Sequence, residues 1–117
     1  MEKICIVVAN EPCVYRDVLA TTLQELRPEL DVMEVDPGEL DSTVARVLPQ
    51  LVVCSELSEV IETRSPAWIV LYPNGESRAE LSVDGRRATL TGGINFACVL
   101  QLIDEVSGAL AQPGARC

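Results

Sequence analysis

The chain has 117 residues, a formal net charge of −9 and no histidine. This length suits one domain with a sizeable core. The negative charge opposes contact with phosphate backbones and anionic lipids, so we expect neither nucleic acid nor a membrane as partner. The lack of histidine removes the commonest general base and the commonest zinc ligand, and we expect no catalysis, metal or cofactor.

The first two thirds of the chain alternate between short apolar runs and amphipathic stretches. Residues 3–9 consist of Lys3 and a continuous apolar run rich in β-branched side chains, which predicts a strand buried on both faces. The elements predicted next are a helix from Pro12 to about 26, a strand at about 31–35, a helix at about 40–48, a strand at 51–54, a short helix near 57–61 and a strand at 68–72.

The alternation of strands and helices breaks after the fourth strand. Three apolar residues, Ala79, Leu81 and Val83, alternate with polar ones and lead into Asp84-Gly85. Alternation around an Asp-Gly pair is the strongest short-range hairpin signal. We therefore predict antiparallel strands at about 78–83 and 86–91, followed by a last helix that Asn95 caps.

This order of elements predicts an α/β fold. We expect a doubly wound, mostly parallel sheet with strand order 2-1-3-4-5, in which the hairpin at about 78–91 replaces the fourth helix. Residues 1–111 should form a single domain and residues 112–117 a mobile tail.

Cysteine usage indicates a cytoplasmic protein. The five cysteines have no CxxC spacing, and the N-terminus lacks a secretory signal pattern. Cys13 follows a strand exit, so a reactive thiol is one open reading, and the carboxylate of Glu11 opposes it.

The most informative positions follow the first and third strands, because ligands bind beyond the carboxyl ends of parallel strands. These exits read Asn10-Glu11 and Ser55-Glu56. Neighbours along a regular strand point to opposite faces, so Ser55 and Glu56 should not face one pocket together. We favour Asn10 and Glu11 as helix caps, and Glu56 as a negative charge at the N-terminus of the following helix, over a cation site.

Several segments resemble the receiver domain of bacterial response regulators. They are Val8-Ala9-Asn10-Glu11-Pro12 with Arg16, Arg27 to Val32, and Pro49 to Ser55, within residues 3–72. The resemblance implies a flavodoxin-like fold. It also implies a site in which two acidic side chains and a phosphoacceptor Asp hold magnesium.

The departures from that family concern the chemistry. Asn10 removes one acidic charge, and Ser55 stands at the acceptor position, where a hydroxyl cannot form an acyl phosphate. Tyr72 aligns with the family's Ser or Thr, and no lysine stands near Gly92. A shift of one residue would instead place Glu56 at the acceptor position, as a permanent mimic of phosphate.

We therefore expect a non-catalytic, receiver-like signalling module that acts through a protein partner or as a homodimer. Its predicted contact surface is Phe96 with a basic cluster on the hairpin, Arg78, Arg86 and Arg87. Charges that merely protect a sheet edge from aggregation are an equal alternative for these arginines.

Two further interpretations remain open. The strand exits could hold a small ligand or a divalent ion, or serve an unrecognised enzyme. Gly92-Gly93 before the last helix could bind an anion, although two glycines usually mark a turn.

Overall fold

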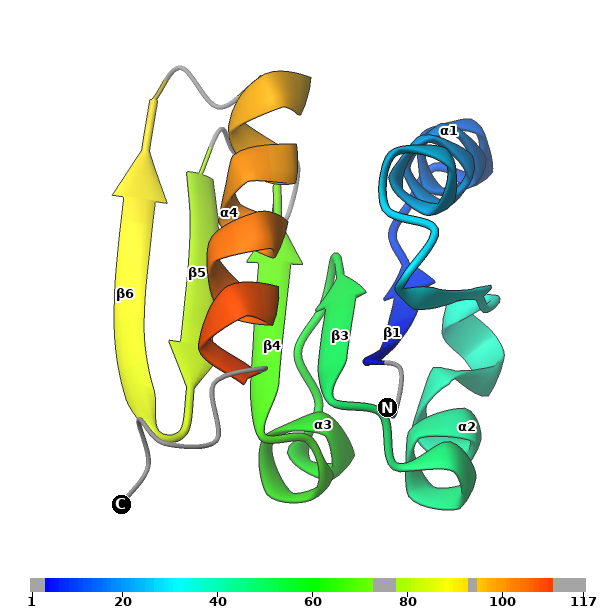
Figure 1. Ribbon diagram of the computed structural model, residues 1–117. Coiled ribbons are helices and arrows are strands. Elements are labelled where there is room, and N and C mark those ends of the chain that lie inside the picture. Colours follow the sequence, from blue (N-terminus) through cyan, green and yellow to red (C-terminus); the bar gives the residue numbers. More distant parts are fainter. Residues whose placement is uncertain (1–3, 73–77, 93–94, 111–117) are drawn as a thin grey trace.

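The computed structural model describes residues 4–72, 78–92 and 95–110. Its centre is a six-stranded sheet in the order β2-β1-β3-β4-β5-β6 (Figure 1). The strands are β1 (Cys5–Ala9), β2 (Asp31–Glu34), β3 (Leu51–Cys54), β4 (Ala67–Leu71), β5 (Arg78–Val83) and β6 (Arg86–Thr91). The helices are α1 (Cys13–Leu26), α2 (Leu40–Val47), α3 (Glu59–Arg64) and α4 (Phe96–Leu110), and the short 3-10 helix η1 (Pro37–Glu39) precedes α2.

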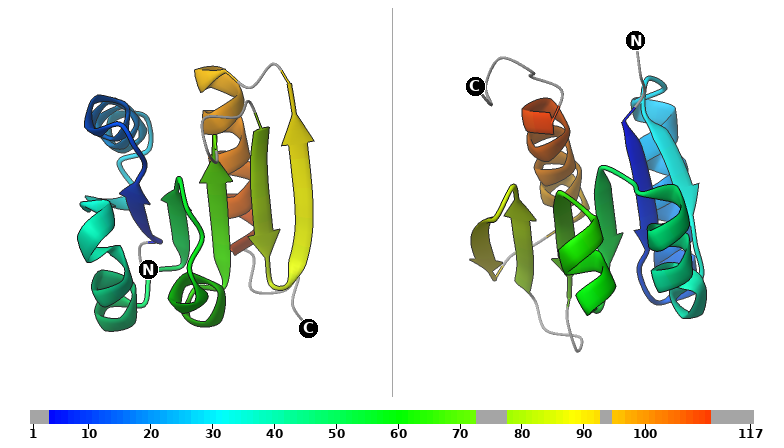
Figure 2. Two further views of the ribbon diagram at one scale, coloured as in Figure 1. Left: turned by 180° about the vertical axis from the view of Figure 1, so that it is seen from behind. Right: turned by 90° about the horizontal axis from the view of Figure 1, so that it is seen from below.

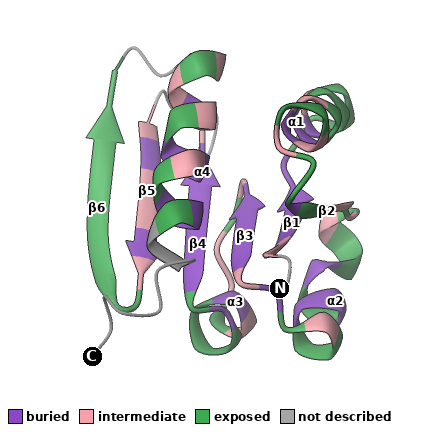
Figure 3. Cartoon of the chain, viewed as in Figure 1, coloured by how far each residue is buried: buried purple, intermediate pink, exposed green. Residues whose placement is uncertain are grey.

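The four strands from β2 to β4 in the sheet are parallel, as the continuous apolar runs predict. Val8 of β1 lies beside Val53 of β3, and Val53 lies beside Ile69 of β4. All residues of β3 and β4 are buried, as Figure 3 shows in purple. Helices on both faces account for this burial, because a parallel sheet needs both faces covered.

Figure 2 shows helices on each side of the sheet, with α1 and α4 on one face and α2 and α3 on the other. Each face has its own apolar core. The first core joins the sheet to α1 and α4 and includes Ile6, Val8, Leu19, Leu23, Val53, Ile69, Val99 and Ile103. The second joins it to α2 and α3 and includes Val7, Ala9, Leu40, Val44, Val52, Cys54, Ile61, Trp68 and Val70.

The predicted hairpin is confirmed at residues 78–83 and 86–91. Asp84 and Gly85 form its two-residue turn with φ of 51° and 86°. Positive φ at both central residues is the signature of a type I′ turn, whose twist matches that of the flanking strands.

The strand order differs from the predicted 2-1-3-4-5 because a sixth strand, β6, extends it. The sheet has six strands, and β5 is antiparallel to β4. Strand β5 is antiparallel to β4 because the connection between them is short. A parallel crossover needs a dozen or more residues, and few lie between Leu71 and Arg78. The hairpin thus continues the same sheet with β6 at its end.

Among the described residues, no helix is long and apolar enough to cross a membrane. The predicted tail at 112–117, with Cys117, and Gly93 of the glycine pair lie outside the described residues.

Candidate functional site

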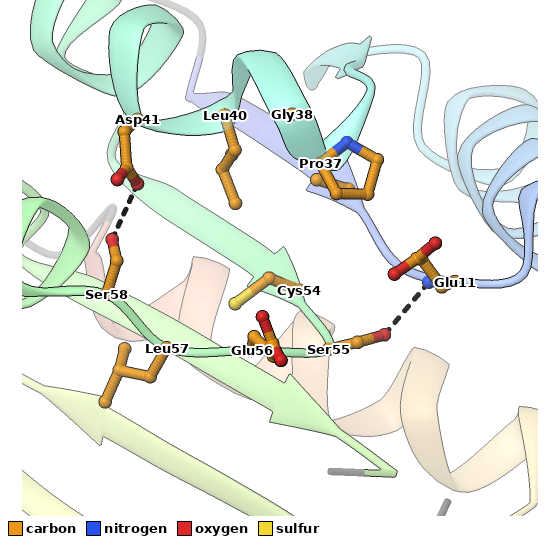
Figure 4. A pocket seen from close by; sticks show the side chains of 11 residues that line it. Glu11, Pro37, Gly38, Leu40, Asp41, Cys54, Ser55, Glu56, Leu57 and Ser58 are labelled. Atoms are coloured by element: carbon orange, nitrogen blue, oxygen red, sulfur yellow. Dashed lines mark hydrogen bonds between the residues drawn. The ribbon is translucent and has the colours of Figure 1, made fainter. Parts of the chain in front are cut away.

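The exits of β1 and β3 meet at the carboxyl edge of the parallel strands. The backbone N–H of Glu11 donates a hydrogen bond to Ser55 Oγ at 2.9 Å. Beside this bond lies a pocket of about 180 Å³ (Figure 4). Its lining comes from three segments of the chain and comprises Ala9, Glu11, Pro37, Gly38, Leu40, Asp41, Cys54, Ser55, Glu56, Leu57 and Ser58.

Ser55 and Glu56 both line the pocket, contrary to the prediction for a regular strand. Strand β3 ends at Cys54, so the strict alternation of faces ends before these two residues. Glu56, predicted at the N-terminus of the following helix, lies two residues before the N-cap of α3 and outside its first turn. Ser58 is the N-cap of α3, its Oγ accepts from the Ile61 N–H at 3.3 Å, and Glu56 precedes that cap.

The pocket carries three carboxylates, and that of Asp41 already accepts a hydrogen bond. Glu11 and Asp41 lie toward opposite ends of the view in Figure 4, with Glu56 between them. The Ser58 hydroxyl donates to Asp41 Oδ1 at 2.7 Å, so both side chains already serve to join α2 to α3. Among the described residues, no group of three His, Cys, Asp or Glu side chains is arranged to hold a metal ion.

Asn10 is not the helix cap that its sequence position predicts. Helix α1 has Pro12 as its N-cap, and no side chain donates or accepts there. Asn10 is instead 1% exposed, and within the described ranges neither Oδ1 nor Nδ2 has a hydrogen-bond partner. It is absent from the lining of the pocket, so it cannot act as a ligand there.

Tyr72 lies apart from the pocket, in a group of three aromatic side chains. Its ring meets Tyr15 edge-on with centroids 5.8 Å apart, and Tyr15 meets Phe96 at 6.3 Å. Burial, and then the neighbouring Tyr72 phenol, raise the pKa of Tyr15 above its ordinary value. Tyr72 has a positive φ of 52°, and Gly92 one of 70°. Neither residue lines the pocket, so the six predicted site residues do not form one site.

The sequence reading missed the part of the pocket that follows β2. Pro37, Gly38 and Asp41 reach it because β2 lies next to β1, so both strands end at the same edge. The expected strand order already placed strand 2 beside strand 1, and the Asp36-Pro37-Gly38 turn follows strand 2. These residues could therefore have been predicted at the same edge of the sheet.

The thiols near the pocket differ in accessibility. Burial, with the charges of Asp41 and Glu56, raises the pKa of Cys54 to about 12, although the Glu56 backbone N–H opposes the shift. Cys54 is therefore an inert core residue. Cys13 is exposed at the start of α1, and its Sγ accepts from Arg16 Nη2 at 3.3 Å.

The residues predicted as an interaction surface are dispersed over the hairpin and α4. Arg87 pairs with Glu62 at 2.6 Å and lies 5.3 Å above the centre of the Trp68 ring. Arg78 pairs with Glu80 at 3.2 Å at the other end of the hairpin. Arg86 follows the turn and is exposed, and the half-buried Phe96 packs against the first core.

Comparison with protein-family models, with characterised proteins and with solved structures finds no match.

Proposed function

We propose that this chain is a non-catalytic, receiver-like regulatory module that acts through protein–protein contacts. The observation that carries the proposal is Ser55 at the exit of β3. The resemblance aligns this residue with a phosphoacceptor carboxylate, and its hydroxyl accepts the Glu11 N–H at 2.9 Å. In this proposal, the Ser55 hydroxyl stands in place of the carboxylate that accepts phosphate in a receiver domain.

The magnesium ligands of such a switch are also depleted. Mg²⁺ prefers anionic oxygen ligands in near-octahedral geometry. Of the two residues after β1, Asn10 is neutral, buried and outside the pocket, which leaves Glu11 as the carboxylate of that exit. The residues present do not fit the family's metal site.

The remaining two parts of the family's chemistry are missing from the sequence. The lysine that follows the fifth strand in receivers has no counterpart, because Lys3 is the lysine of this chain and precedes β1. At the position of the family's Ser or Thr, the Tyr72 ring packs against Tyr15. These losses support a fold that is kept for binding other proteins.

Incubation with acetyl phosphate and Mg²⁺, followed by intact-mass spectrometry, tests the proposal. We expect no adduct, while a phosphorylatable receiver domain run in parallel gains one. A stoichiometric, acid-stable adduct on this chain that hydroxylamine removes would overturn the proposal, because that lability is typical of an acyl phosphate.

A second candidate function is binding of a small cationic ligand in the pocket of Figure 4. The observation that favours it is the presence of Glu11, Glu56 and Asp41 around one cavity of about 180 Å³. A ligand at 100 times its Kd would stabilise the fold by about 2.7 kcal/mol. A thermal-shift screen with divalent ions and small amines tests this candidate.

The matched variants for that screen are Glu56→Gln, inside the pocket, and Glu59→Gln, in the first turn of α3 and outside its lining. A pocket ligand should lose its shift with the first variant and keep it with the second. Equal shifts in both variants, or none with the unchanged protein, would exclude this candidate.

A further inference from the structure

Within the part of the chain that the structure describes, strand β6 is an open edge of the sheet. It lies at the end of the strand order, and all six of its residues are exposed (Figure 3). Unpaired N–H and C=O groups along such an edge are a ready template for another strand.

Two hydrogen bonds at the ends of β5 fix this orientation. The Tyr72 N–H donates to the Arg78 C=O at 2.9 Å, and the Asp84 N–H donates to the Pro66 C=O at 2.9 Å. Backbone groups alternate in direction along an antiparallel pair, so the even-numbered residues of β5 face β4 and the odd-numbered ones face β6. The β6 residues opposite the odd-numbered residues of β5 direct their N–H and C=O groups toward β5. The other three residues of β6 direct these groups outward, and they are Arg87, Thr89 and Thr91.

The opposite edge of the sheet is protected. In β2, the Val32 N–H donates to Gln24 Oε1 at 3.1 Å, and Gln24 Nε2 donates to the Leu30 C=O at 2.7 Å. Strand β2 is also short, with Asp31 and Glu34 at its ends. A side-chain cap and charged ends are the devices that blunt an edge, so head-to-tail addition of β6 to β2 of another copy is disfavoured.

We propose that two copies of this chain pair β6 with β6, antiparallel, about a two-fold axis, so that one sheet runs through both. An isologous contact of this kind closes on itself and uses the same strand twice. The inference rests on the proposed function, since it names the partner for those protein–protein contacts.

The side chains of β6 favour one register. A two-fold axis perpendicular to the sheet keeps every side chain on its own face of the sheet. Opposite residues of the two copies must therefore belong to the same face, so the axis passes beside one residue of β6, which lies opposite its own copy. If the axis passes beside Ala88, Arg87 lies opposite Thr89 of the second copy. Thr89 of that copy in turn lies beside its Glu80, so Arg87 and Glu80 belong to one row of side chains across the sheet. Centred on Thr89 instead, Arg87 would share a row with Arg78 of the second copy, and the like charges would repel.

The same register suits the other face of the strand. Arg86 lies opposite Leu90 of the second copy, a large apolar side chain that is 36% exposed. The aliphatic stem of an arginine can cover such a surface while its charge stays in water. Two small Ala88 side chains meet at the axis, and no arginine stands opposite another.

Salt dependence is a distinctive readout of this pairing. Each copy carries a net charge of −9, so the two copies repel at long range. Screening of that repulsion should tighten the dimer as ionic strength rises. Binding of a separate acidic partner to the arginines would weaken under the same change.

Analytical ultracentrifugation of the full chain, under reducing conditions and over a range of concentrations and salt, tests the proposal. We expect a monomer–dimer equilibrium that salt shifts toward the dimer. Thr89→Pro removes an outward N–H without touching the ladder to β5, and it should weaken dimerisation about tenfold or more. The matched variant Thr89→Ala keeps that N–H and should dimerise like the unchanged protein.

A second variant keeps the test decisive if Thr89→Pro fails to fold. Ala88→Lys sets two cations opposite each other at the axis and should give a folded monomer. A protein that is monomeric at every concentration, or a dimer that survives both variants, overturns the inference. The measurement involves no phosphodonor, so a failed dimer and a failed non-catalytic assignment remain distinguishable.

Discussion

The Glu11 N–H donates to Ser55 Oγ at 2.9 Å and so joins the loop after β1 to the loop after β3. The same two residues line the pocket between those loops. The hydroxyl that the receiver resemblance aligns with a phosphoacceptor thus has a structural role, which replacement of Ser55 can measure.

Ser55→Ala should destabilise the fold. The variant leaves the Glu11 N–H without its partner, and a typical hydrogen bond contributes about 0.5–1.5 kcal/mol, with exposed bonds at the lower end. Urea unfolding followed by circular dichroism gives the free energy of unfolding. Ser42→Ala is the control, since the Ser42 hydroxyl donates only to the nearby Glu39 C=O. Equal losses in the two variants would contradict a loop-joining role for Ser55.

Stability should fall at alkaline pH. The pKa of Cys54 is raised from 9.0 to about 12 in the folded state, so the folded chain holds this proton more tightly than the unfolded chain. The contribution is fully present below pH 9 and is lost as pH rises through the folded value, by about 1.4 kcal/mol per pH unit.

The measurement compares urea midpoints at pH 8 and pH 10.5 for the unchanged protein and Cys54→Ala. The variant is less stable at pH 8 because it leaves a cavity, but its stability should fall less with pH. Tyr15 and Cys5, whose pKa values burial also raises, leave a remaining slope in both proteins. Identical slopes would show that Cys54 does not titrate as the structure implies.

Arg87→Ala should change the fluorescence of Trp68, the one tryptophan of the chain. The Arg87 guanidinium lies 5.3 Å from the ring centre, and such exposed contacts contribute about 0.5–1 kcal/mol. Its removal admits water to the ring, so we expect a red-shifted emission maximum. Arg86→Ala is the matched control, because the alternation along β6 places Arg86 on the other face. A shift of equal size in the control would refute the contact.

Two glycine substitutions should have opposite effects on stability. Gly85 has a φ of 86°, where an L side chain costs about 1–2 kcal/mol, so Gly85→Ala should destabilise the hairpin. Gly108 lies within α4, with open space around the site of a Cβ, and Gly108→Ala should stabilise the fold by about 0.5–1 kcal/mol. Thermal unfolding of both variants checks the signs, and destabilisation by Gly108→Ala would contradict the geometry of α4.

The hairpin was predictable to the residue because its signal is local. Asp84-Gly85 sets the turn, and the alternation of side chains on either side sets the strands. The sixth strand was missing from the predicted order 2-1-3-4-5, because the default doubly wound order has five strands and the second strand of the hairpin was not added to it.

The candidate site was predicted only in part, for equally physical reasons. Glu11 and Ser55 were expected at neighbouring strand exits and lie there. The capping role of Asn10 failed because Pro12, two residues further on, occupies the N-cap of α1, and a sequence does not reveal which of several nearby residues holds that position. The place of Glu56 depended on where β3 ends, and boundaries of short strands follow tertiary contacts more than local propensity.

The most direct test of a lost phosphorylation switch is a two-dimensional NMR titration of the ¹⁵N-labelled chain with Mg²⁺ and then with acetyl phosphate. The amides of Glu11 and Ser55 report on the two strand exits and on the bond that joins them. We predict no saturable shift at either amide with either addition. Saturable shifts at both amides with Mg²⁺, followed by a second set with acetyl phosphate, would contradict the non-catalytic assignment.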